Sequence, residues 1–378
     1  MNINFIFYSI IPDFENFHRR REIEAIASKA GKDNKRVIYF NPPAFFIKKF
    51  LFKYTKHKNF EHPDIKICNL YTLCPMSWAL KYPFLQLLFV ATPIKIQTWY
   101  YKKQYLSPAD TTISWFYKPD QYSYLKSLKP YIYLHYDNYK GDESYQFNKS
   151  KNFDATVNDC ISNSLMTLIC SAKLFEHYTL SNPSNVYYYP NAISRSLLQH
   201  QAADFNQTEE KVIGFIGQLD DSFDFSLLEK IASNFSDYKI SLIGEVKNKI
   251  ILDIAAKYSN IELLGYVSYE NLSPKIKTFA IGICPYKQTD FNQYRNPLKI
   301  SEYFSYGLPV VSVECDIDKG ARKMVAVASS HNEFLELLKK ELNDNNEEKA
   351  ELRKAFTQNN CWDNRATFIL DNIIKNNK

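Results

Sequence analysis

Short, nearly uninterrupted apolar runs alternate along this chain with segments of helical periodicity. Such runs suit strands that are buried on both faces, as in parallel sheets, where the intervening helices form the crossover connections. The alternation stops at residues 196–210 and then restarts, which predicts two α/β blocks with parallel sheets. The runs are INFIFYS (3–9), RVIYF (36–40), TTISWFY (111–117), YIYLHY (131–136), LMTLIC (165–170), KVIGFIG (211–217), YKISLIG (238–244), IELLG (261–265), FAIGICPY (279–286) and PVVSV (309–313).

The length of 378 residues exceeds what a single hydrophobic core usually supports, so two domains are expected. The break in the pattern predicts a first Rossmann-like domain at 1–195, a linker at 196–210 and a second Rossmann-like domain at 211–360. The remaining residues, 361–378, read as a C-terminal helix.

Several protein classes are disfavoured by what the sequence lacks. No run reaches about 18 apolar residues, so no helix is expected to span a membrane. The N-terminus has no basic region and no small-residue cleavage site, so no signal peptide is expected. The seven cysteines are scattered without C-x-x-C spacing, which indicates reduced thiols in a cytosolic protein and no zinc site. G-x-G-x-x-G and G-x-x-x-x-G-K-[ST] are both absent, which disfavours dinucleotide and P-loop binding.

Charge is distributed unevenly along the chain. Residues 1–190 hold 24 Lys and Arg against 15 Asp and Glu, a net of +9, and the remainder of the total +6 is −3. The segments 43–60 and 78–106 are basic and rich in aromatic residues, so we expect them to lie on an anionic membrane surface. Alternatively, their rings pack inside and their lysines are solvated. A nucleic-acid partner is not expected, because no known binding module accompanies these segments.

The stretch RNPLKISEYFSYGLPVVS predicts a helix, a tight turn and a buried strand. Asn296 suits the N-cap and Pro297 the first helical position, which places Lys299 near the positive end of the helix dipole. Glu302 follows on the same face. The pair is either a surface ion pair, or Lys299 and the helix N-terminus hold an external anion.

Glycines follow three strands of the second block. Gly217, Gly244 and Gly265 stand at predicted carboxyl ends of strands, where ligands bind in open parallel sheets. In GFIGQLDD, Gly214 and Gly217 are placed at the first strand–helix turn, where a glycine would let backbone N–H groups approach a phosphate. Tight turns need glycine in any case, so these glycines alone do not distinguish a phosphate site from an ordinary turn.

From about Val212 to Val313 the chain resembles the nucleotide-sugar-binding domain of GT-B fold glycosyltransferases of the family 1/4-like type. The resemblance is carried by GFIGQLDDSFDFSLLEKIA, YKISLIG, NIELLGYVSYENLSPKIKTFAIGICPY and NPLKISEYFSYGLPVVS, which occur in the family's order. LICSAKLFEHY and VYYYPNAIS resemble the end of the family's first domain, and CWDNRATFIL resembles its closing helix. The most similar members are bacterial polysaccharide glycosyltransferases of capsule, teichuronic acid or exopolysaccharide assembly.

The resemblance implies two Rossmann-like domains that face a cleft, with the C-terminal helix returning to the first domain. It also implies that Lys299 contacts the donor diphosphate and that Glu302 contacts the donor ribose. Asn296 and Arg295 join this donor-binding set, with Gly217 and Gly244 at the strand ends. One departure is Tyr294, which stands where many retaining members have a first glutamate.

The aromatic and catalytic candidates follow from the same resemblance. Tyr266 and Tyr286 are candidates to stack on the base, or are packing residues. Asp137 follows the strand YIYLHY and is the first candidate for the general base, unless it caps a turn. His18 and Asp13, in the loop after the first strand, are the other candidates. Alternatively, His18 starts a helix that Arg19, Arg20 and Glu22 continue on a solvated face.

The expected function is transfer of a sugar from a nucleotide-sugar, a UDP-sugar in the first instance, to a lipid-linked or growing glycan of a bacterial surface polysaccharide. The enzyme is expected in the cytoplasm, peripherally on the inner face of the cell membrane. Neither a metal nor another cofactor is expected. The alternatives are a GT-B-fold nucleotide-sugar 2-epimerase and a non-catalytic glycan- or nucleotide-binding partner of an assembly complex.

Overall fold

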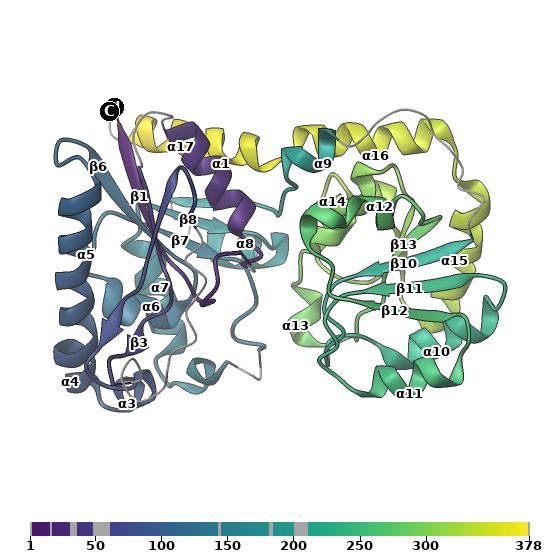
Figure 1. The fold of residues 1–378 in the computed structure, drawn as a ribbon, viewed down its shortest axis with the longest axis horizontal. Coiled ribbons are helices and arrows are strands. Elements are labelled where there is room, and N and C mark those ends of the chain that lie inside the picture. Colours follow the sequence, from purple (N-terminus) through teal and green to yellow (C-terminus); the bar gives the residue numbers. More distant parts are fainter. Residues whose placement is uncertain are drawn as a thin grey trace. The chain divides into compact units, whose positions relative to one another are not determined.

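The computed structural model describes residues 2–15, 17–30, 36–47, 61–142, 145–180, 184–199 and 211–376. It divides into two compact units (Figure 1). Unit 1 comprises Met1–Cys170, Leu174–Tyr189 and Trp362–Lys378, and unit 2 comprises Ser171–Lys173 and Pro190–Cys361. Apart from Ser171–Lys173, unit 2 begins at Pro190, before the predicted boundary at 195. The predicted linker begins inside a helix, α9 (Arg195–Gln199), and its residues 200–210 lie outside the described residues.

Unit 1 is built on a seven-stranded sheet in the order β4-β2-β1-β6-β7-β8-β9, and every pairing is parallel. The apolar runs predicted as strands form its centre, and every residue of β1, β2, β7 and β8 is buried. A two-stranded sheet, β3 (Ala44–Phe45) with β5 (Tyr71–Thr72), lies apart from it. The main strands are β1 (Ile3–Tyr8), β2 (Val37–Phe40), β4 (Ile65–Cys68), β6 (Thr111–Phe116), β7 (Tyr131–His135), β8 (Met166–Ile169) and β9 (Val186–Tyr188).

Helices connect these strands and cover the sheet of unit 1. A helical run without interruption leads from α4 through a π-helical turn, η1, into α5. The helices are α1 (Arg20–Ala30), α3 (Met76–Lys81), α4 (Pro83–Gln86), η1 (Leu87–Ala91), α5 (Thr92–Tyr105), α6 (Pro119–Leu125), η2 (Gln146–Lys149), α7 (Phe153–Ser162) and α8 (Ala172–Thr179), the last of which begins in unit 2. Within the described residues, no helix is both long and apolar enough to cross a bilayer.

Unit 2 has a six-stranded parallel sheet in the order β12-β11-β10-β13-β14-β15. Its strands are β10 (Val212–Ile216), β11 (Lys239–Ile243), β12 (Ile261–Gly265), β13 (Ile281–Cys284), β14 (Val310–Val313) and β15 (Ala326–Ala328). Its helices are α9, α10 (Phe225–Asn234), α11 (Ile250–Lys257), η3 (Tyr269–Asn271), α12 (Ser273–Ile276), α13 (Asp290–Gln293), α14 (Leu298–Ser305), η4 (Arg322–Met324), α15 (His331–Asp344) and α16 (Glu347–Asn359). All of these strands except β15 fall on predicted apolar runs, and the predicted α/β class with parallel sheets is confirmed.

The C-terminal helix α17 (Trp362–Asn376) belongs to unit 1, where it packs against α1. Its buried face carries Ala366, Ile369 and Ile373. The guanidinium of Arg19 lies 5.3 Å from the centre of the Trp362 ring. The predicted return of this helix to the first domain is therefore confirmed.

The alternative in which His18 starts a helix with Arg19 and Glu22 on its solvated face is wrong. Arg19 is only 2% exposed and Glu22 only 1%. Arg19 Nη1 lies 3.6 Å from Glu22 Oε2, and Arg19 Nη2 donates to Cys170 Sγ at 2.7 Å. Because α17 covers the start of α1, which begins at Arg20, these two charges are enclosed and neutralise each other.

Candidate functional site

Helix α14 begins one residue later than predicted. Its first helical residue is Leu298, Pro297 stands at the N-cap with φ −73° and ψ 113°, and no side chain caps the helix. The prediction of Asn296 at the N-cap and Pro297 at the first helical position is therefore wrong by one residue. Lys299 becomes the second helical residue, inside the first turn, where backbone N–H groups and the helix dipole favour an anion.

Asn296 does not cap α14 because other segments hold its side chain. Its Oδ1 accepts a hydrogen bond from the backbone N–H of Asn191 at 3.2 Å, and its Nδ2 donates to the carbonyl of Asp316 at 3.1 Å. The Nδ2 of Asn191 donates in turn to the carbonyl of Asn296 at 2.7 Å. These bonds fix the loop that leads into α14. Asn191 and Asn296 are far apart in the sequence, so the sequence does not indicate that they pair.

The buried face of α14 anchors the helix on the sheet. Ile300, Tyr303 and Phe304 are buried, and the backbone N–H of Ile216 in β10 donates to the Tyr303 hydroxyl at 3.0 Å. A Cβ on Gly282 would lie 2.4 Å from the Tyr303 ring, so only glycine leaves room for it there. The position of Lys299 is thus set by a helix that is packed directly on the central strands.

Lys299 is half-buried against two aromatic rings. Its Nζ lies 4.3 Å from the centre of the Phe215 ring and 4.7 Å from that of Tyr286. A Cβ on Gly217 would lie 2.7 Å from this Nζ, so the glycine makes room for the ammonium group. Burial, assisted by the charge of Arg295, lowers the pKa of Lys299 to about 8. Any anion that bound here would offset the cost of burying this charge.

Glu302 lies on the same face of α14 and is only 8% exposed. Burial raises the pKa of its carboxyl group to about 7, against the opposing effect of the Lys299 charge. Among the described residues Lys299 forms no direct ion pair, with Glu302 or with another carboxylate. The interpretation of the two as an exposed surface pair is therefore wrong.

Two glycine turns stack at the carboxyl ends of β10, β11 and β12. Gly217 has φ 139° and Gly244 has φ 154°, in the region that favours glycine. The N–H of Gly217 donates to the carbonyl of Ile243, and that of Gly244 to the carbonyl of Gly265, both at 2.8 Å. A Cβ on Gly244 would lie 1.9 Å from the carbonyl oxygen of Gly217. This edge of the sheet therefore has bare backbone beside Lys299.

Gly214 does not belong to this edge, contrary to the expectation that it stands at the first strand–helix turn. It lies inside β10, and a Cβ there would meet the Phe279 ring at 1.9 Å. Its role is close packing of the ring on the strand.

Arg295 and the two candidate tyrosines differ in their contacts and in their exposure. The Arg295 guanidinium lies 4.8 Å from the centre of the Tyr286 ring, and its Nη1 donates to the Ser222 hydroxyl at 3.2 Å. Tyr286 is only 3% exposed and lies against both Arg295 and Lys299, which supports the packing alternative for this ring. Tyr266 directly follows β12 and is 66% exposed, so its ring is open to solvent.

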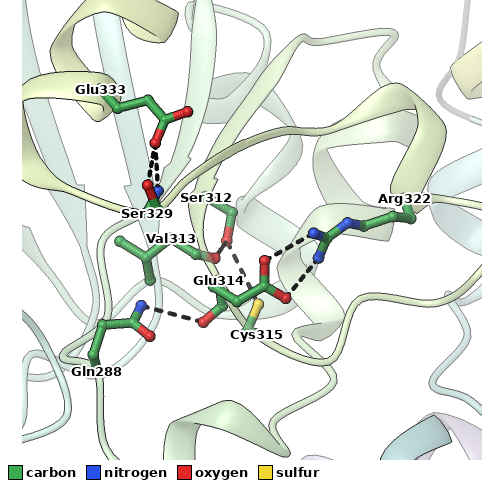
Figure 2. A network of polar contacts seen from close by, with 8 residues as sticks. All are labelled: Gln288, Ser312, Val313, Glu314, Cys315, Arg322, Ser329 and Glu333. Carbon is green, nitrogen blue, oxygen red and sulfur yellow. Dashed lines mark hydrogen bonds and ion pairs between the residues drawn. The ribbon is translucent and has the colours of Figure 1, made fainter.

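A polar network after β14 holds the loop that reaches Asn296 (Figure 2). The carboxylate of Glu314 accepts two hydrogen bonds from Arg322, at 2.9 and 2.8 Å, and this pairing lowers the pKa of Glu314. Gln288 donates to the carbonyl of Glu314 at 3.2 Å. Asp316, two residues on, offers its carbonyl to Asn296 and its carboxylate to the backbone N–H of Lys173 at 3.2 Å. The loop after β14 thus supports the loop before α14.

The described residues contain no group of three or more His, Cys, Asp or Glu side chains placed to hold a metal ion. Arg295, Lys299 and Glu302 are charged groups near the start of α14, and the charge of Asp220 also acts on Lys299. The two cations attract negative charge, and the carboxylate of Glu302 can accept hydrogen bonds from hydroxyl groups.

Comparison with known proteins shows what this region is similar to. Residues 210–344 match the model of the family described as glycosyl transferases group 1. The putative teichuronic acid biosynthesis glycosyltransferase TuaH of Bacillus subtilis (strain 168) is 26% identical over 178 residues, which are 45% of this chain and 43% of TuaH. The chain thus matches less than half the length of this curated relative.

Solved structures resemble the chain over nearly its whole length. Sucrose-phosphate synthase from Thermosynechococcus elongatus has a TM-score of 0.71 at 12% identity, covering 99% of each chain. Anabaena HepE in complex with UDP has a TM-score of 0.64 at 11% identity, covering 99% of this chain and 100% of its own. At these identities the likeness is one of fold, and the predicted GT-B fold is confirmed.

Residues 210–344 contain all the donor-binding candidates, whereas the catalytic candidates lie in unit 1. Asp137 follows β7 by two residues and is half-buried, and its carbonyl accepts from the N–H of Tyr139 at 2.9 Å. His18 is exposed, and its ring lies 5.2 Å from that of Tyr136, next to Asp137. The loop after β1 and the end of β7 thus bring His18 and Asp137 into one neighbourhood.

Asp13 is engaged differently, because its Oδ1 accepts from the backbone N–H of Glu15 at 3.0 Å in a local turn. His135, at the end of β7, is buried, and its Nδ1 lies 2.6 Å from the Tyr133 hydroxyl. Burial lowers the pKa of His135 to about 3, so this imidazole is a neutral core group.

Proposed function

We propose that this chain is a glycosyltransferase that moves a sugar from a UDP-linked donor to a lipid-linked or growing glycan. One observation carries the proposal: Lys299, half-buried in the first turn of an uncapped helix, lies beside the bare backbone of Gly217 and has no carboxylate paired with it in the described chain. TuaH is named for teichuronic acid biosynthesis, and HepE was solved with UDP and with UDP and glucose. Both support the choice of donor and of polymer.

In this proposal the donor diphosphate lies at the N-terminus of α14. Lys299 and Arg295 neutralise its charge together with the helix dipole, and Gly217 and Gly244 leave space for the phosphate oxygens beside the backbone. Glu302 accepts hydrogen bonds from the ribose hydroxyls. Of the two candidate tyrosines, Tyr266 is the exposed one and is the proposed partner that stacks on the uracil.

The reaction joins an acceptor hydroxyl oxygen to C1 of the donor sugar while the bond from C1 to the phosphate oxygen breaks. UDP leaves with the bonding electrons, and the cations of α14 stabilise its new negative charge. The acceptor proton passes to a general base, for which Asp137 is the proposed group and His18 the second candidate. No step requires a metal ion in this scheme.

Calorimetric binding of UDP, GDP, ADP and CMP to the parent and to Lys299→Ala tests the donor site. We expect UDP to bind the parent, and Lys299→Ala to weaken binding by roughly 10- to 100-fold, the worth of a hydrogen bond to a charged group. Lys277→Ala is the matched control, because Lys277 is an exposed lysine of the same unit. If the parent bound none of the four nucleotides, the proposal would be refuted.

A second measurement separates the transferase from the epimerase and binding-partner alternatives. UDP-sugars are incubated with the parent, with and without glycan acceptors, and the products are separated. Release of UDP that depends on an acceptor supports transfer. An epimerised UDP-sugar without acceptor, or no turnover by a protein that binds UDP, contradicts it.

A further inference from the structure

Large apolar side chains are exposed on one part of unit 1 far more than elsewhere. Eleven of the 17 exposed large apolar side chains among the described residues fall between Phe46 and Tyr100. Figure 1 shows the helices α3, α4 and α5 together at one side of unit 1. Many exposed apolar side chains on neighbouring helices indicate an interaction site. We call it the α3–α5 face and define it by Trp78, Phe84, Leu87, Leu88, Ile96 and Trp99.

Helix α5 has one face on the sheet and one face in solvent. Ile94 and Thr98 are buried, and the Thr98 hydroxyl lies 3.0 Å from that of Tyr8 in β1. Ile96, Trp99 and Lys103 follow one another at helical spacing on the other side and are exposed. Ile94 and Thr98 already anchor α5 on the sheet. The exposed side chains of Ile96 and Trp99 lie on the side of the helix that does not pack there.

The exposed apolar surface continues along the preceding turns. Phe84, Leu87 and Leu88 have the i, i+3, i+4 spacing of one helical face and are 65%, 64% and 56% exposed. Val90, by contrast, is fully buried. Trp78 on the neighbouring α3 is 60% exposed. The face is therefore formed by two helical segments and is not a single misplaced side chain.

Charge selects the occupant of this surface. Residues 65–109 contain five lysines and no Asp or Glu. Lys95 and Lys103 are exposed, and the Lys103 Nζ lies 5.5 Å from the centre of the Trp99 ring. A second copy presenting the same face would bring like charges together. Anionic lipid headgroups above an apolar layer match both the lysines and the rings.

We propose that the α3–α5 face binds the surface of a bilayer that contains anionic lipids. The rings of Trp78 and Trp99 enter the headgroup region, and Lys95 and Lys103 extend to the lipid phosphates. The inference deepens the proposed function by naming the surface from which a lipid-linked acceptor would be reached, and it rests on that function only for the acceptor. The other predicted membrane segment, 43–60, lies outside the described residues from 48 onward.

Vesicle binding of the full chain tests the proposal, and the fluorescence of the chain's own tryptophans reports the binding. Of the four tryptophans, Trp115 is fully buried and Trp362 is 3% exposed, so a vesicle-dependent fluorescence shift must come from Trp78 and Trp99. We expect sedimentation with vesicles of phosphatidylcholine and phosphatidylglycerol, a blue shift, quenching by brominated lipid chains, and little binding to phosphatidylcholine alone. Trp99→Ser should lower partitioning about tenfold, and each of Lys95→Gln and Lys103→Gln about fivefold.

Leu352→Ser and Lys339→Gln are matched controls in unit 2, where the parent side chains are also exposed, and both should bind vesicles as the parent does. Circular dichroism and UDP binding verify that Trp99→Ser is folded. Absence of parent binding to the anionic vesicles would overturn the proposal. So would a lipid-free dimer that Trp99→Ser dissociates, because the face would then belong to a second copy. Vesicle binding without nucleotide binding would reject the proposed function and leave this inference standing.

Discussion

Replacing Glu302 by Gln should stabilise the protein while weakening its binding of UDP. Burial raises the pKa of Glu302 from its usual 4.5 to about 7, so the folded state binds a proton between these pH values that the unfolded state has released. Stability from this group is therefore present below about pH 4.5 and is lost as the pH rises to 7. The difference of 2.5 pKa units corresponds to about 3 kcal/mol above pH 7.

The expected gain for Glu302→Gln is somewhat smaller, roughly 1 to 3 kcal/mol at pH 8, because Lys299 loses a favourable neighbouring charge. At pH 4 the variant and the parent should be equally stable. All four tryptophans lie in unit 1. Stability of unit 2 is therefore followed by hydrogen exchange of the β10 and β13 amides.

Glu336→Gln, an exposed glutamate of the same unit, is the control and should show no pH-dependent gain. The reasoning is refuted if the difference in the free energy of unfolding between Glu302→Gln and the parent is the same at pH 4 as at pH 8. It is also refuted if Glu302→Gln binds UDP as tightly as the parent, since the carboxylate would then not contact the ribose.

Three further variants test other parts of the structure. Gly244→Ala places a Cβ against the Gly217 carbonyl at positive φ, so it should lower the free energy of unfolding of unit 2 by about 2 to 4 kcal/mol. Hydrogen exchange measures this loss, and a loss under about 0.5 kcal/mol would contradict the close approach. Arg19→Met leaves Glu22 buried without its cation and should cost unit 1 about 3 to 5 kcal/mol by tryptophan fluorescence in urea, and adding Glu22→Leu should restore most of it. Asp137→Asn should lower the transfer rate about 10²- to 10⁴-fold with unchanged UDP binding, and an unchanged rate would move the base to His18.

The sequence locates the central strands well, because buried parallel strands are apolar throughout. It misses β4 and β15, which are short edge strands of the two sheets. It also places Lys299 and Glu302 on one helix face. It misses the start of α14 by one residue, since capping rules treat Asn296 as a local residue, whereas Asn191 and Asp316, distant in sequence, bind its side chain. Tertiary contacts override local preference there.

Burial of charge is the property that the sequence conveys least. Arg19 and Glu22 have the spacing of an exposed ion pair, and only the return of Trp362 over α1 encloses them. The ring of Tyr286 is likewise indistinguishable in sequence from the exposed ring of Tyr266, because both tyrosines stand just beyond the ends of strands. Which of the two is covered depends on Arg295 and Lys299 folding over one of them.

The path of the chain through the two units has a consequence for synthesis on the ribosome. Unit 2 is almost wholly one continuous stretch, Pro190–Cys361, whereas unit 1 needs α17, which is made after unit 2, to cover Arg19 and Glu22. Unit 2 is therefore able to fold as soon as it emerges. Until α17 has been made, Arg19, Glu22 and the apolar face of α1 stay uncovered. A truncated or stalled chain that lacks α17 should be the form that chaperones and proteases recognise.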